Sequence, residues 1–469
     1  MTNTNEQPVD WLQHIKLEFN NCYDLTIQSV ANQQITLCYF DHLLEKAQYH
    51  QVITAFLDDA PAEDGRDRMM GIFNEVYGHN HADRLQHFTE AVLSGKIGAV
   101  YNNNLYSISA GNGQTRSIES SQKDTTVIGP HDAFVENAMI NLSLVRRLLQ
   151  TTSLKVQQFN IGKDQTIHTY FLYLEDQASP KVVEEARRRL SQLRIQQALD
   201  TSQIAKRLED FPYSFFPQWL HSERPDDTCF QLMKGKIAVI TAGSPTMIMA
   251  PTSFLEYFGV IGDVYERWQF GVFIRILRLL AVAISLLFSA VYVAVTTYHY
   301  QFIPQSLLTT IIQSRLKIPF EPMVEAFLME AVIELLREAS ARLPNKIAQT
   351  IGIVGGLVLG QAVVEAGLAS NVLIVAVAAG ALASFIMPSY SMETSLRILK
   401  FFAILAAGFM GYYGILMFLA LLITHICHLT SLKREYMMLN HFIAFFSEGR
   451  DKLWNSLLKK SGSGKQGGS

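Results

Sequence analysis

The pattern of apolar and charged residues changes sharply along the chain. Through Trp268, charged and apolar residues are mixed as in a water-soluble domain, whereas from Val272 to His428 charge is sparse and long apolar runs appear. Apolar runs of this length can cross a bilayer. The pattern predicts an α+β cytosolic region of about 270 residues, followed by an all-α polytopic membrane domain.

The soluble half contains a weak internal repeat. A predicted strand and helix from Ile35 match those from Thr166, and a predicted β-hairpin from Ser94 matches one from Lys234. We therefore expect two related α+β subdomains, over residues 1–115 and 116–265, with a polar linker from Asn112. The alternative is chance similarity between two ordinary strand–helix–hairpin segments.

Two further features fall in the second subdomain. After Pro130, the spacing of apolar residues predicts a helix over residues 131–150. From Glu209 the chain forms a loop rich in proline and aromatic residues, with Phe215, Phe216 and Trp219 as candidate anchors. Such a loop either contacts another surface or packs on its own domain.

The membrane domain is expected over residues 266–432, with a cytosolic tail over 433–469. Four candidate spans begin at Val272, Ile347, Asn371 and Ile398. Basic residues precede the first span and follow the last, which predicts that both termini are cytoplasmic and that the number of crossings is even. The N-terminal residues also lack the pattern of a signal peptide.

An acidic amphipathic helix is predicted from Pro319, between the first two spans. Glu330, Glu334 and Glu338 stand four residues apart and therefore share one face. A lipid-exposed span of this composition would be costly. The segment is expected either to lie flat at the interface or to pack inside an oligomer with its carboxylates facing water.

Small residues crowd the next two predicted helices, which favours close helix packing. Within the glycine-rich helix, Ile353, Leu357, Gln361 and Glu365 are candidate pore-lining residues, and the three glutamates above would add negative potential for cations. The alternative is that Glu365 lies near a helix end and extends to the lipid headgroups.

Composition excludes several classes of protein. The net charge of −3 gives no basic field for nucleic acid, and the four widely spaced cysteines favour a reduced compartment. The sequence has no P-loop, no dinucleotide-binding glycine motif, and no zinc-protease or hydrolase signature. We therefore expect no catalytic residues, no metal, no cofactor and no enzymatic activity.

Several long motifs resemble those of the GerA family, the A subunits of bacterial spore germination receptors. They are the run from Pro319 to Ser370 and the segments GPHDAFVEN, FPQWLHSERPD and GKIAVITAGSP. The family-motif positions, which we expect at interfaces, are Gly129, Pro130, Glu136, Asn137, Pro217, Glu223, Arg224, Pro225, Gly243, Ser244 and Pro245. The chain departs from the family pattern after HLTSL, and a stage V sporulation protein AF branch shares the pattern.

The resemblance implies a subunit of the spore inner membrane that works with a B-type transporter-like sensor subunit and a C-type lipoprotein. It also implies a homo-oligomer that forms a ligand-gated cation path and opens when a germinant binds. Two alternatives remain open at this point. They are a non-conducting scaffold or signal-coupling subunit, and a secondary transporter, for which inverted repeats and a discontinuous helix would be expected.

Overall fold

The computed structural model describes residues 10–30, 35–44, 73–109, 129–162, 166–195, 200–343, 356 and 360–437. Within these residues the chain divides into two compact units. A soluble α+β unit contains residues 1–212, 219–252 and 431–434, and a helical unit contains residues 213–218, 253–430 and 435–469. The predicted linker from Asn112 lies outside the described residues.

The first part of the soluble unit is an antiparallel sheet with the strand order β1-β2-β4-β5-β3. Its strands are β1 (Leu25–Val30), β2 (Ile35–Phe40), β3 (Asn74–Glu75), β4 (Lys96–Tyr101) and β5 (Asn104–Ser109), and its helices are α1 (Trp11–Glu18) and α4 (His81–Leu93). Asn102 and Asn103 have φ of 45° and 64°. They form the two-residue turn that links β4 to β5, so the hairpin predicted from Ser94 is present.

The second part is a sheet with the strand order β6-β7-β9-β10-β8. Its strands are β6 (Leu154–Ile161), β7 (Ile167–Leu174), β8 (Leu220–Ser222), β9 (Ile237–Thr241) and β10 (Met247–Ala250), and its helices are α5 (Ala138–Leu148), α6 (Pro180–Gln192), α7 (Thr201–Leu208) and α8 (Pro225–Met233). Helices α6 and α7 cover one face, and α5 and α8 cover the other. Because both faces are covered, β9 and β10 are buried along their whole length.

The two sheets have the same topology. In each, one helix precedes the first two strands, and a short edge strand followed by a helix precedes the last hairpin; the second part also has α6 and α7 between β7 and β8. The predicted matches pair β2 with β7 and the β4–β5 hairpin with the β9–β10 hairpin, and these occupy equivalent places in the two sheets. This is the arrangement that an internal repeat requires.

The helix expected over residues 131–150 begins later than predicted. Asn137 caps α5 by accepting a hydrogen bond from the Met139 N–H at 3.0 Å, so the helix starts at Ala138. The preceding residues are not helical, and the Phe134 N–H donates to the Glu223 carbonyl at 2.7 Å. The prediction from apolar spacing began the helix seven residues too early, because it did not take into account the side-chain cap that sets the start of α5.

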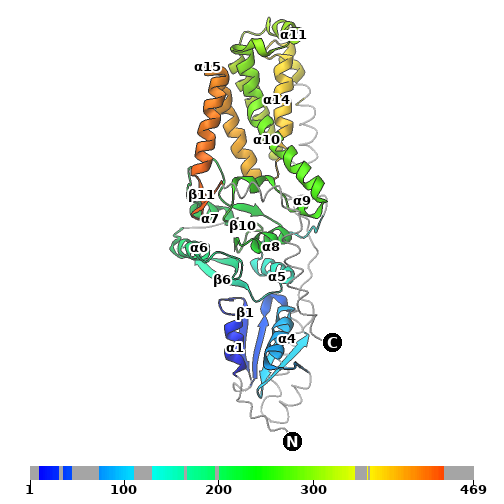
Figure 1. Ribbon diagram of the computed structural model, residues 1–469, viewed down its shortest axis with the longest axis vertical. Helices are drawn as coiled ribbons and strands as arrows, with labels where there is room; N and C mark the ends of the chain where they lie inside the picture. Colours follow the sequence, from blue (N-terminus) through cyan, green and yellow to red (C-terminus); the bar gives the residue numbers. More distant parts are fainter. Residues whose placement is uncertain are drawn as a thin grey trace. The chain divides into compact units, whose positions relative to one another are not determined.

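The helical unit contains two helices, among the described residues, that are long and apolar enough to cross a membrane. They are α10 (Trp268–Thr297) and α15 (Tyr390–His428), and α14 (Asn371–Ser384) is a shorter apolar helix. The remaining helices are α9 (Gly262–Tyr265), α11 (Gln305–Arg315) and α12 (Pro322–Ala341). One apolar core joins α10, α12, α14 and α15. Figure 1 shows α10 beside α14 and α15. Most of the span predicted from Ile347 lies outside the described residues.

Helix α15 is broken at Gly411, whose backbone has φ 58° and ψ −137°. Ser395 donates to the Phe215 carbonyl, and Ser214 bonds His425 at 2.9 Å, so both ends of α15 contact the same short segment. A straight helix would separate Ser395 from His425 by about 45 Å. The predicted span from Ile398 is therefore two antiparallel helices, which Figure 1 shows next to each other.

The break leaves carbonyl groups at the end of the first half without helical partners, and one side chain contacts two of them. The Tyr298 hydroxyl contacts the carbonyl oxygens of Gly408 and Phe409 at 3.1 and 3.0 Å. A side chain at Gly411 would place Cβ 2.8 Å from the His299 ring. Glycine is required at this position by both its backbone and its surroundings.

Candidate functional site: an ion-pair ladder in the helical unit

Helix α12 carries carboxylates on the side that packs along the first half of α15. Glu330 and Glu334 are four residues apart on α12, and Arg397 and Lys400 are three residues apart on α15, so each pair shares one helix face. The two helices run antiparallel, because Arg337 meets Glu393 at one end and Met323 lies beside Gly408 at the other. This direction brings the acidic face of α12 against the basic face of α15.

The central rung is a fully buried ion pair. The Lys400 Nζ lies 2.6 Å from Glu330 Oε2, and the Ser289 hydroxyl of α10 donates to Glu330 Oε1 at 2.6 Å. Glu330 is 0% exposed and Lys400 is 2% exposed. Both carboxylate oxygens therefore have donors, as burial of a charge demands.

The next rungs continue toward the C-terminal end of α12. Glu334 lies 3.6 Å from Lys400 and 3.5 Å from Arg397. One turn further, Arg337 pairs with Glu393 and donates to Ser384 at 2.7 Å. The ladder thus contains three carboxylates (Glu330, Glu334 and Glu393) and three bases (Arg337, Arg397 and Lys400), and its net charge is zero.

A separate contact ties the N-terminal end of α12 to α14. Glu325 is 0% exposed and accepts a hydrogen bond from the Ser370 N–H at 2.5 Å, with Arg315 at 3.7 Å. Ser370 is the N-cap of α14, and its hydroxyl also bonds Tyr292 at 2.7 Å. Contacts from Glu325 to Arg337 therefore hold α12 against α10, α14 and α15 within the helical unit.

The structure separates the residues predicted to line an ion path. Glu330 and Glu334 belong to the ladder, whereas Glu338 is largely exposed and pairs with Arg342 of its own helix. Gln361 and Glu365 are exposed on the helical segment 360–365. Ile353 and Leu357 lie outside the described residues. The ladder bases were missed, although Lys400, a basic residue inside the span predicted from Ile398, is itself a signal that a buried acid is nearby.

Family-motif residues of the second subdomain lie in contacts between loops. Arg224 donates to both oxygens of Asp226, at 3.0 and 2.7 Å, and to the Pro130 carbonyl at 3.0 Å. The Gly243 N–H donates to the Glu136 carbonyl at 2.9 Å. Gly129 and Gly243 have φ of 120° and 92°, values that favour glycine.

Other motif positions also have structural roles. Pro225 is the first residue of α8, and the Ser244 hydroxyl donates to Asp200 at 2.5 Å. In the helical unit, the Pro217 carbonyl accepts hydrogen bonds from the hydroxyls of Tyr257 and Tyr436, at 2.8 and 2.7 Å. Among the described residues, no three His, Cys, Asp or Glu side chains converge as metal ligands.

This architecture defines a class of membrane-associated protein, with a soluble α+β unit and a helical unit that buries matched charges. Residues 13–461 match the family described as Bacillus/Clostridium GerA spore germination protein, so the chain belongs to that family. The resemblance drawn from the sequence motifs is confirmed.

Similar proteins carry the same kind of name. Spore germination protein GerQA of Bacillus cereus is 35% identical over 87% of this chain and 82% of its own length. Spore germination protein A1 of Bacillus subtilis (strain 168) is 37% identical over 76% of this chain and 74% of its own length. The crystal structure of the N-terminal domain of the A subunit of the Bacillus megaterium spore germinant receptor GerK3 matches 54% of this chain and 99% of its own, with 22% identity and a TM-score of 0.39.

Proposed function

We propose that this chain is the A-type subunit of a nutrient germinant receptor in the spore inner membrane. In this proposal it oligomerises into a ligand-gated cation channel whose opening triggers germination. Its family membership and the names of its relatives support the germination role. A B-type transporter-like subunit senses the nutrient, a C-type lipoprotein completes the receptor, and this chain has no enzymatic activity and no cofactor.

The packing of the helical unit supports six membrane crossings rather than four. Contacts of Glu325 with Ser370 and of Arg337 with Ser384 show that α12 and α14 run parallel. Helix α10 runs the opposite way, because Tyr292 near its C-terminal end bonds Ser370 at the start of α14. The first half of α15 also runs the opposite way, because Glu393 near its start pairs with Arg337 near the end of α12. Crossings by α10, α12, α14 and both halves of α15, together with the span expected from the sequence at Ile347, give an even number, which keeps both termini cytoplasmic in this proposal.

Because the ladder has no net charge, the proposed ion path does not run along α12. Glu330 and Glu334 have basic partners within 3.6 Å and therefore contribute little free potential. By contrast, Gln361 and Glu365 are exposed, and among the described residues neither has a side-chain partner. This exposure of a polar and an acidic side chain, on the helix predicted to line the pore, is the observation that carries the proposal.

Neighbouring glycines suit that helix for packing against copies of itself. A Cβ built on Gly356 or Gly360 has no described atom within 4 Å. Small residues of this kind let helices approach closely in a membrane. Gln361 and Glu365 would then face a shared axis.

Cation release from spores tests the proposal directly. In spores whose only A-type subunit is this chain, a defined mixture of amino acids, sugars and nucleosides should release monovalent cations. Gln361→Leu and Glu365→Gln should slow that release at least tenfold, and Glu338→Gln, an exposed carboxylate outside the proposed path, should not. Unchanged release and ion selectivity in the Gln361→Leu/Glu365→Gln double variant would overturn the pore assignment.

The charge balance of the ladder also favours a second function, a non-conducting scaffold or signal-coupling subunit that includes the stage V sporulation type. A helical unit with matched charges offers no net field for cations along α12. The two functions differ in oligomeric state. A ring-sized mass in mild detergent supports the channel, and a monomer supports the scaffold, because the helices of one chain are too few to enclose a pore.

A further inference from the structure

A short hairpin follows α15 directly. Its strands are β11 (Thr430–Ser431) and β12 (Arg434–Glu435), and Leu432 and Lys433 form its turn. Both turn residues have left-handed backbone, with φ of 47° and 60°. Side chains such as leucine and lysine disfavour that conformation. The contacts of the hairpin must therefore hold the turn in place.

The tip of the hairpin belongs to the soluble unit. Leu432 is 3% exposed and is part of the apolar core that α6 and α7 form on the second sheet, with Leu208 and Trp219 among its members. The Ser431 hydroxyl accepts a hydrogen bond from the Thr252 N–H at 3.1 Å, although these residues are 179 positions apart. Residues 431–434 thus return to the soluble unit after the whole of the helical unit.

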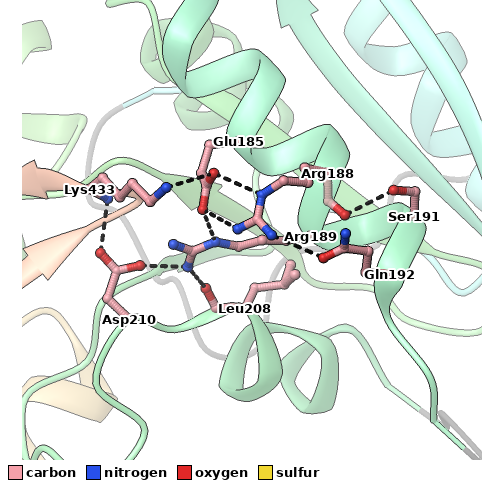
Figure 2. Close-up of polar contacts among 8 residues, drawn as sticks. All are labelled: Glu185, Arg188, Arg189, Ser191, Gln192, Leu208, Asp210 and Lys433. Carbon is pink, nitrogen blue, oxygen red and sulfur yellow. Dashed lines mark hydrogen bonds and ion pairs between the residues drawn. The ribbon is translucent and has the colours of Figure 1, made fainter.

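A ring of charges fixes the second turn residue (Figure 2). The Lys433 N–H donates to Asp210 Oδ2 at 2.9 Å, and its ammonium donates to Glu185 Oε2 at 3.1 Å. Arg189 bridges the same two carboxylates, with Nε 2.8 Å from Glu185 and a terminal nitrogen 2.5 Å from Asp210. Hydrogen bonds from Arg188, Arg189 and Lys433 hold the pKa of Glu185 well below its usual range.

The hairpin leaves little slack between this ring and α15. Leu429 is the C-cap of α15, and its carbonyl accepts a hydrogen bond from the Tyr436 N–H at 3.0 Å, which closes the base of the hairpin. Only Thr430 and Ser431 separate Leu429 from Leu432. Three extended residue steps reach about 10 Å at most. A displacement of α6 that carries Leu432 and Lys433 with it must therefore pull on the last turn of α15.

From this geometry we infer that the Leu432–Lys433 hairpin is a coupling strap, through which rearrangement of the soluble unit moves α15 and opens the conducting path. The inference rests on the proposed channel function. Glu185, Arg189 and Asp210 act as its anchor, and Leu432 acts as the apolar plug that seats it.

Two matched variants separate the strap from the charge cluster itself. Lys433→Ala and Arg188→Ala each remove one cation from Glu185, but only Lys433 lies on the hairpin. Lys433→Arg retains the charge and serves as the conservative variant. Leu432→Ser combined with Lys433→Ala removes the two side-chain attachments, which are the apolar contact of Leu432 and the ammonium contact with Glu185. Immunoblots of spore membranes and thermal unfolding of the purified full-length chain establish that each variant accumulates and folds.

The first measurement is the rate at which a maleimide labels Cys427, an exposed native thiol in the last turn of α15. Peptide mapping distinguishes it from the other three cysteines. Release of the strap should free the last turn of α15 and raise the labelling rate at least fivefold in Leu432→Ser/Lys433→Ala. Arg188→Ala and Lys433→Arg should label at the wild-type rate. An unchanged rate in the double variant would overturn the inference.

The second measurement is cation release from spores after addition of the defined nutrient mixture. Release should fall at least tenfold in Leu432→Ser/Lys433→Ala and stay normal in Arg188→Ala and Lys433→Arg. Faster labelling with normal release would overturn the coupling role, since the strap would then anchor α15 without transmitting motion. Failure of the channel function has a different signature, which is release that does not respond to Gln361→Leu.

Discussion

Removal of the lysine from the central rung of the ladder should strongly destabilise the helical unit. At the 2.6 Å Nζ–Oε2 distance of Lys400 and Glu330, the attraction between unit charges is about 6 kcal/mol at an effective dielectric constant of about 20. Desolvation of the two ions cancels most of that gain. Lys400→Met leaves the cost of the buried carboxylate without the attraction, and only the Ser289 hydroxyl remains as a donor. We expect a loss of about 3–5 kcal/mol.

The partner substitution should reverse most of this loss. Glu330→Gln retains the shape of the side chain and an oxygen for Ser289, so the double variant Glu330→Gln/Lys400→Met buries no charge at this rung. It should unfold within about 1 kcal/mol of the wild type. Arg342→Ala is the matched control, because it breaks a pair whose side chains are 79% and 64% exposed and should change stability by at most about 0.5 kcal/mol.

Denaturation of the full-length chain in detergent micelles, followed by helical circular dichroism, measures these differences. The reasoning requires a positive coupling energy between the two substitutions. It is refuted if Lys400→Met unfolds within about 1 kcal/mol of the wild type, or if the double variant is as unstable as the single one. The first result would mean that water or another base already compensates Glu330, and the second would mean that the loss does not come from an unpaired carboxylate.

Three further predictions follow from the structure. Burial, against the opposing effect of Asp24, lowers the pKa of His42 from 6.5 to about 4, so the unfolded chain takes up a proton between these values. The soluble unit should lose roughly 3 kcal/mol as the pH falls through that window, and His42→Gln should flatten the profile of melting temperature against pH. Gly411→Ala should cost about 2–4 kcal/mol, because its backbone is left-handed and its Cβ meets His299; micelle unfolding measures this. Arg224→Lys loses the two-point bond to Asp226 and should lower the urea midpoint of the soluble unit by the equivalent of about 2 kcal/mol.

The sequence was sufficient where the signal was local. The β4–β5 hairpin was predictable because two asparagines interrupt alternating apolar residues, and such a turn needs only its own backbone. Helix α10 was predictable because its apolar run is continuous. The motifs were long enough to indicate the family, and the match of residues 13–461 to that family confirms it.

Only the tertiary structure decided the features that depend on distant partners. Hydropathy reads α15 as one span because both halves are apolar, and the break at Gly411 depends on Tyr298, over a hundred residues earlier. Lys400 is a second example, because hydropathy treats its charge as unfavourable inside a membrane span. Its partner Glu330 lies seventy positions away. Packing brings the two charges together and turns two unfavourable residues into one neutral pair, so the energy of each side chain depends on a contact that no local pattern contains.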